Sequence, residues 1–257
     1  MIGAIVDPAM THPRATSLVL ALLLASVLRT GPASASDLAD AILAGNSSGV
    51  SALIEAGALP DQNTARGLPL HLAIEKGDVA VTAALLRGGA NVETAGEPAG
   101  AHALHLSALR NDVAISILLI KHGARTEARD AKGRTPVMVA AEAGSTRALS
   151  VLLDNGANVD SFNPATGETA LGYAVAANRI ECAKLLIEEG ADPNLPNKGS
   201  GQTPIFHAAR LGFVDMVELL VDSGADLNIR DAHGRSVRQA TTDQEMTAIL
   251  QELGFAE

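Results

Sequence analysis

The sequence predicts an all-α solenoid of about seven stacked helix–turn–helix units, on the basis of three observations. A glycine returns every 32 to 34 residues, and an apolar triplet such as Val151-Leu152-Leu153 stands shortly before each of these glycines. Of the 257 residues, 47% are hydrophobic but only 2% are aromatic, which suits thin layers rich in alanine and leucine better than one large core. A repeat of this length indicates units that pack only on their neighbours. The recurring glycines are Gly57, Gly89, Gly123, Gly156, Gly190 and Gly224.

The stretch from Asp130 to Asp160 shows what one unit contains. A turn signal is followed by Thr135-Pro136, where threonine can cap the free amides of a helix and proline suits the first helical position. Ala140-Ala141 are small enough to let a second helix lie close. Gly144 interrupts the run, leucines at helical spacing follow, and Gly156 stands where a left-handed residue ends a helix.

Several segments share the same openings and closings. The openings are Thr135-Pro136…Ala140-Ala141, Leu68-Pro69-Leu70-His71-Leu72-Ala73 and Thr203-Pro204-Ile205-Phe206-His207-Ala208-Ala209, and the closings are Gly89-Ala90-Asn91, Gly156-Ala157-Asn158, Gly190-Ala191-Asp192 and Gly224-Ala225-Asp226. These motifs resemble a known family, the ankyrin repeat, over roughly residues 37 to 254. The resemblance implies helix–turn–helix repeats joined by hairpin-like connectors, called fingers below, and a protein-binding role without catalysis.

The repeats divide residues 36–257 into seven units at approximately 37–66, 67–99, 100–132, 133–166, 167–200, 201–233 and a closing cap at 234–257. The first unit lacks the Thr-Pro signature, as a terminal repeat with one side facing water can. In it we expect Asp37 to cap a helix that ends at Leu43, and a second helix over Val50 to Glu55. Ser236 should start the first helix of the cap.

Residues 1–35 read as an export signal. Arg14 precedes the apolar run Leu18 to Leu28, and Ala33-Ser34-Ala35 fits the small-x-small cleavage pattern, so cleavage is expected between Ala35 and Ser36. The alternative is an uncleaved membrane anchor, but a span needs about 20 apolar residues and this run is shorter. Translation could start at Met1 or Met10. We therefore expect an exported bacterial protein, periplasmic or secreted, with no stable membrane insertion after cleavage.

The composition argues against several other functions. A formal net charge of −10 provides no basic stripe for nucleic-acid phosphates. The single cysteine, Cys182, excludes an intramolecular disulfide and a cysteine-based metal site, and we expect it to be a buried thiol.

His71 and His105 hold equivalent positions about 10 Å apart, too far to share a metal; in the family this histidine usually bonds the backbone of the next finger. A metal held by His102 and His105 remains a weak alternative.

The remaining candidate is the surface, because no cofactor site or catalytic constellation is evident. The resemblance places partner contacts at finger tips and at the two residues after the Ala-Ala of each first helix. We expect a monomer that presents this concave surface to a protein partner; the alternatives are a secreted effector or toxin-associated factor and, less favoured, an enzyme or metal-binding protein. The candidates are Glu75, Lys76, Leu109, Arg110, Lys132, Arg134, Glu142, Ala176, Gln202, Arg210, Leu211, His233 and Arg235, with Glu168 as a further tip.

Overall fold

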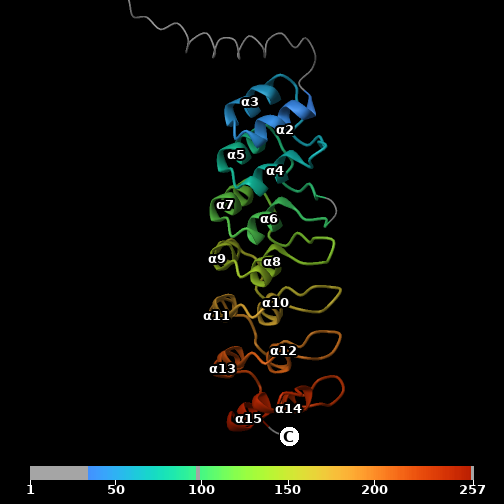
Figure 1. The fold of residues 1–257 in the computed structure, drawn as a ribbon, viewed down its shortest axis with the longest axis vertical. Coiled ribbons are helices and arrows are strands. Elements are labelled where there is room, and N and C mark those ends of the chain that lie inside the picture. Colours follow the sequence, from blue (N-terminus) through green and yellow to red (C-terminus); the bar gives the residue numbers. More distant parts are fainter. Residues whose placement is uncertain (1–33, 97–98, 256–257) are drawn as a thin grey trace, which may run out of the picture.

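The computed structural model describes residues 34–96 and 99–255, and this part of the chain is an all-α stack (Figure 1). The predicted leader lies outside the described residues except for Ser34 and Ala35. Fourteen helices form seven pairs within the described part. The first helices are α2 (Ala35–Leu43), α4 (Pro69–Lys76), α6 (Ala103–Leu109), α8 (Pro136–Ala143), α10 (Ala170–Ala176), α12 (Pro204–Leu211) and α14 (Val237–Ala240); the second helices are α3 (Ser47–Glu55), α5 (Val79–Arg87), α7 (Val113–Lys121), α9 (Thr146–Asp154), α11 (Ile180–Glu188), α13 (Val214–Asp222) and α15 (Gln244–Glu252).

The helices form two parallel rows, with the fingers beside the row of first helices (Figure 1). The extensive helix–helix contacts join only helices of the same repeat or of adjacent repeats. Side chains such as Ala140, Ala141, Leu149 and Leu152 are completely buried between the layers. The core is therefore a continuous sequence of thin interfaces, as the alanine-rich composition predicts.

The first helix of the fourth repeat, α8, begins and ends as the repeat motif predicts. In α8, the Thr135 hydroxyl accepts the amide of Met138, and Pro136 occupies the first turn, where its missing N–H is not needed. Gly144 ends α8 with φ of +82°, a conformation that glycine adopts without strain. Gly156 has φ of +83° after α9, so the predicted left-handed stop is confirmed.

The first repeat differs from the prediction at both of its helices. Asp37 is not the cap of α2: Ser34 is the cap, and Asp37 lies three residues later as its partner in a capping box. The second helix α3 begins at Ser47 rather than Val50, because the Asn46 side chain accepts the amide of Gly49 and fixes an earlier start. The helix α2 thus includes Ala35, the residue that precedes the predicted cleavage point.

A ladder of side-chain acceptors links the loops that follow the second helices. Each rung joins a side-chain oxygen of one repeat to a backbone N–H of the next repeat, so every rung fixes the register of two layers. Four of the five acceptors are carboxylates. The rungs are Asp61 to the amide of Asn91 (2.8 Å), Glu93 to Arg125 (2.9 Å), Glu127 to Asn158 (3.0 Å), Asp160 to Asp192 (3.3 Å) and Asn194 to Asp226 (2.7 Å).

A second link between repeats caps a helix from outside its own repeat. The cap residue of α9, Ser145, makes no capping bond with its side chain. Instead Asn111, which ends the first half of the preceding repeat, accepts the amide of Ala148 through its side-chain oxygen at 2.9 Å. Asn111 has φ of +55°, in the left-handed region that glycine occupies at Gly77, Gly144 and Gly212. Asparagine here supplies both the left-handed turn and the cap.

Asn178 provides a matched control for this cap, because it has φ of +54° but makes no side-chain hydrogen bond to any described residue. Asn111→Gly and Asn178→Gly both remove the strain of a left-handed asparagine, but only the first removes a cap. We expect Asn111→Gly to be less stable than Asn178→Gly by about 1 kcal/mol in urea unfolding. Equal free energies of unfolding for the two variants would contradict the cap.

Candidate partner-binding face

The candidate residues lie mainly on the inner face, defined here as the C-terminal ends of the first helices α4 to α12 together with the fingers beside them. Most of them are exposed, and Leu109 and Leu211 stand out because 55% and 39% of their surface remains accessible. Arg110 and Arg210 are exposed next to them. The exposed members are Glu75, Lys76, Leu109, Arg110, Lys132, Glu142, Ala176, Arg210, Leu211, His233 and Arg235; Arg134 and Gln202 are half-buried.

One finger holds Arg134 in an internal network. The buried carboxylate of Asp130 accepts the backbone amides of Lys132 and Arg134 and the Arg134 guanidinium at 2.8 Å. Burial raises the pKa of Asp130, but the hydrogen bonds and positive charge of Arg134 outweigh this and lower the pKa below its ordinary value. The same guanidinium also pairs with Glu142 at 2.5 Å. Arg134 and Glu142 are therefore partly occupied with each other, and Lys132 is the cation that this finger leaves to solvent.

The last finger repeats this arrangement with the same sequence pattern, Arg-Asp-Ala-x-Gly-Arg. Asp231 accepts the amides of His233 and Arg235 and the Arg235 guanidinium at 2.7 Å. Gln202 reaches the same carboxylate from the preceding finger at 3.4 Å. Burial opposes the charge, yet the hydrogen bonds from Arg235 hold the pKa of Asp231 far below its usual range. Gln202 and Arg235 thus help to shape the finger, whereas the His233 side chain remains exposed.

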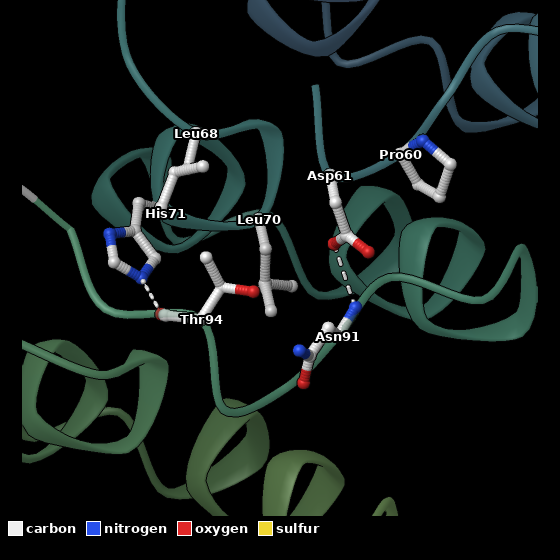
Figure 2. Close-up of a pocket in the computed structure, with 7 residues that line it drawn as sticks. All are labelled: Pro60, Asp61, Leu68, Leu70, His71, Asn91 and Thr94. Carbon is white, nitrogen blue, oxygen red and sulfur yellow. Dashed lines mark hydrogen bonds between the residues drawn. The ribbon is translucent and has the colours of Figure 1, made fainter. Parts of the chain in front are cut away.

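The equivalent histidines of the second and third repeats act as predicted on the neighbouring finger. His71 Nε2 lies 3.2 Å from the Thr94 carbonyl (Figure 2), and His105 Nε2 lies 2.9 Å from the Arg134 carbonyl. A carbonyl only accepts, so Nε2 carries the proton in both rings. Burial lowers the pKa of both histidines, more than these hydrogen bonds raise it, and keeps the rings neutral.

The other titratable candidates behave as structural groups. Within residues 34–96 and 99–255, no group of three His, Cys, Asp or Glu side chains is arranged to hold a metal, including around His102 and His105, whose rings lie 5.6 Å apart. Cys182 is buried as predicted, and burial raises the pKa of its thiol to about 11, which keeps it protonated and unreactive. In the same described ranges no helix is long and apolar enough to span a bilayer.

A polar cluster between repeats five and six was only partly predicted. Gly172 occupies the position that is histidine in His71 and His105, and the Glu168 carboxylate fills the space: a Cβ on Gly172 would lie 2.2 Å from Glu168 Oε2. Asn197 of the next finger donates to this carboxylate, and His207 Nε2 lies 3.6 Å from it. Glu168 was predicted only as a finger tip. The contact between His207 and Glu168 could have been suspected from the pair Phe206-His207. In repeat six, phenylalanine takes the position of His71 and His105, and the histidine stands one residue later.

The comparison with protein families agrees with this architecture. A profile described as ankyrin repeats in three copies matches four overlapping segments, at residues 38–130, 70–163, 104–197 and 162–231. The chain belongs to the ankyrin repeat family. Ankyrin repeats generally mediate protein binding, the fold is generally non-catalytic, and no enzyme family matches.

Solved ankyrin repeat structures extend the likeness to nearly the whole described stack. The ankyrin repeat domain of Bcl-3, described as a unique member of the IkappaB protein family, is 27% identical with a TM-score of 0.76, covering 84% of this chain and 97% of that one. The human ASB11 ankyrin repeat domain is 28% identical with a TM-score of 0.72, covering 86% and 98%. No curated protein sequence matches significantly.

Because the Glu168 carboxylate fills the space beside Gly172, substitutions at these two positions should not have additive effects on stability. Helix propensity alone would predict additive effects. Gly172→Ala should gain about 1 kcal/mol of helix stability, but the new methyl group displaces the Glu168 carboxylate and breaks its contacts with Asn197 and His207. We expect a net change near zero in the native background and stabilisation of about 1 kcal/mol in a Glu168→Ala background. A double-mutant cycle by urea unfolding measures this, and additive effects of the two substitutions would contradict the contact.

Proposed function

We propose that this chain is an exported, non-enzymatic scaffold that binds a protein partner through the inner face of its ankyrin stack. The observation that carries the proposal is the exposure of Leu109 and Leu211 beside Arg110 and Arg210 on a face that the family uses for binding. Exposed leucines flanked by arginines are a common composition for an interaction surface. The rigid stack supports binding because few groups must be ordered when a partner arrives.

The candidate residues fall into two groups, according to whether their side chains already form hydrogen bonds or ion pairs within the chain. Leu109, Arg110, Ala176, Arg210 and Leu211 make no side-chain hydrogen bond or ion pair with described residues, so a partner can contact them without breaking existing interactions. Arg134, Gln202 and Arg235 are held by the finger carboxylates, and we propose that they set the shape of the face. Leu109 and Leu211 are therefore the most informative positions to change.

The test introduces a negative charge on each side of the stack. Leu109→Glu and Leu211→Glu should each weaken capture of the partner from a periplasmic extract at least tenfold, whereas Ile117→Glu should not. Ile117 is a matched control, since it is an aliphatic side chain 36% exposed on the second helix α7. Circular dichroism and urea unfolding check that the three variants fold equally. Capture that survives both inner-face variants, or is lost only with Ile117→Glu, would place the partner elsewhere.

We also propose that residues 1–35 direct export and are removed after Ala35. The support is the sequence pattern alone: Arg14, the apolar run from Leu18 to Leu28, and Ala33-Ser34-Ala35. Expression in a bacterium followed by intact-mass analysis should give periplasmic protein that begins at Ser36. A full-length mass in the membrane fraction would support an uncleaved anchor, and recovery in the medium would favour the alternative of a secreted effector.

Removal of Ser34 and Ala35 has a structural consequence. Ser34 supplies the capping box of α2, so the exported chain would lose that cap. The loss falls in the first repeat, which has a neighbour on only one side, and is expected to be about 1 kcal/mol of local helix stability.

A further inference from the structure

The inner face contains a small pocket between the first two fingers. In this pocket only one of the two ring nitrogens of His71 has a hydrogen-bond partner among the described residues. The cavity measures about 180 Å³ and lies against α4. Leu68, Leu72 and Ala95 give it apolar walls, and His71, Arg66 and Glu75 supply its main polar groups. His71 and Glu75 are one helical turn apart, so both side chains lie on the same face of α4.

The Nδ1 atom of His71 is a hydrogen-bond acceptor without a donor. Because Nε2 donates to the Thr94 carbonyl, the neutral ring leaves Nδ1 with a free lone pair. In repeat three the same atom of His105 accepts the backbone amide of His102 at 3.2 Å, but His71 Nδ1 forms no hydrogen bond with any described residue. Figure 2 shows this edge of the ring pointing away from Leu70 and Thr94. The residue as a whole is only 8% exposed, so the pocket is the side from which a donor can reach this nitrogen.

The charges around the pocket also leave an acceptor free. The two cations nearby have other contacts: Arg66 lies 3.9 Å from Asp40 in an exposed ion pair, and the Lys76 ammonium donates to the Leu43 carbonyl. Glu75 is exposed and has no ion pair with a described residue. The acceptors available to a ligand are therefore a neutral imidazole nitrogen and a carboxylate, beside the Asn63 amide group, which both donates and accepts.

Gly96 allows the finger to lie close to this ring. A Cβ at Gly96 would lie 2.2 Å from His71 Nδ1, so any other residue would cover the acceptor or push the finger away. The absence of a side chain keeps the pocket accessible beside the imidazole.

We infer that this pocket receives an arginine side chain from the protein partner. A guanidinium offers several N–H donors in one plane and a positive charge, which together suit the His71 nitrogen and the Glu75 carboxylate. The methylene stem would pack on Leu68 and Leu72. Binding hot spots are enriched in tryptophan, tyrosine and arginine. Because this chain has no tryptophan and only one tyrosine, we expect the partner to supply such a residue, and arginine fits the acceptors of this pocket. The inference deepens the proposed function, because it names the chemistry of one partner contact on the same face.

The test is a titration of the ¹⁵N-labelled full chain with the blocked tripeptide acetyl-Gly-Arg-Gly-amide. Saturable amide shifts should centre on His71 to Glu75, and the His71 Nδ1 resonance should move as it accepts a hydrogen bond. Glu75→Gln should weaken binding about tenfold, the loss expected for a charge-assisted hydrogen bond. Glu188→Gln, at an exposed position on the second helix α11, should change nothing. His71→Phe should abolish binding and still fold, because Phe206 is completely buried at the equivalent position of repeat six.

Three results would overturn the inference. They are the absence of saturable shifts at α4, equal binding of the lysine or tyrosine tripeptide, and binding that Glu75→Gln leaves unchanged. The titration uses a tripeptide and needs no identified partner. If the tripeptide does not bind, the proposal that Leu109 and Leu211 contact a protein partner still stands. If Leu109→Glu and Leu211→Glu leave capture unchanged, the titration still tests the pocket by itself.

Discussion

No repeat in this chain is thick enough to bury its own apolar face, and the rest of the structure depends on that constraint. Between the two ends of the stack, each pair of helices, seven to nine residues long, has to cover one side with the preceding pair and the other with the following pair. Alanines such as Ala140 and Ala141, both fully buried, let the layers approach closely enough for this. Stability is then carried by the interfaces between layers, so whatever holds two layers in register stabilises the whole stack.

Polar contacts between repeats set that register, and they are not equally favourable. The ladder of side-chain acceptors joins the successive loops from Asp61 to Asp226, but the Asp160 rung brings a second carboxylate, Asp192, nearby. Burial, and then the charge of Asp192, raise the pKa of Asp160, so its charged form is less favourable in the folded state than in the unfolded chain. The titration of Asp160 therefore stabilises the folded chain below the ordinary pKa of aspartate, and this contribution is lost as the pH rises through the raised pKa, although the hydrogen bond from the Asp192 amide by itself favours the charged form. The next rung uses neutral Asn194 and avoids the repulsion.

The sequence predicted the architecture because local signals repeat and agree with one another. Thr135-Pro136, Gly144 and Gly156 each fix a helix end, and their recurrence fixes the stacking. The contacts that were not predicted join residues in different repeats. Asn111 has the pattern of an ordinary left-handed helix stop, and only the structure places the amide of Ala148, in the next repeat, beside its side chain. Within one repeat, the buried Ser107 stands where alanine is expected and accepts a hydrogen bond from the Ser116 hydroxyl of the opposing helix. The sequence could also place Arg134 on a finger without showing that Asp130 and Glu142 engage it, because those ion pairs depend on the folded path of the finger.

The distinction between engaged and free groups changes what the inner face can do. In a rigid stack, side chains held by buried carboxylates cannot turn toward a partner without breaking charge-assisted hydrogen bonds. Arg134 and Arg235 therefore give the fingers fixed shapes, and we propose that recognition depends on groups without such contacts: the exposed leucines, Arg110 and Arg210, Glu75, and the Nδ1 atom of His71. These groups lie in different repeats, so a partner has to span several layers to contact them together. An extended segment or a long edge of a folded domain satisfies that geometry, whereas a small molecule could reach only one site at a time.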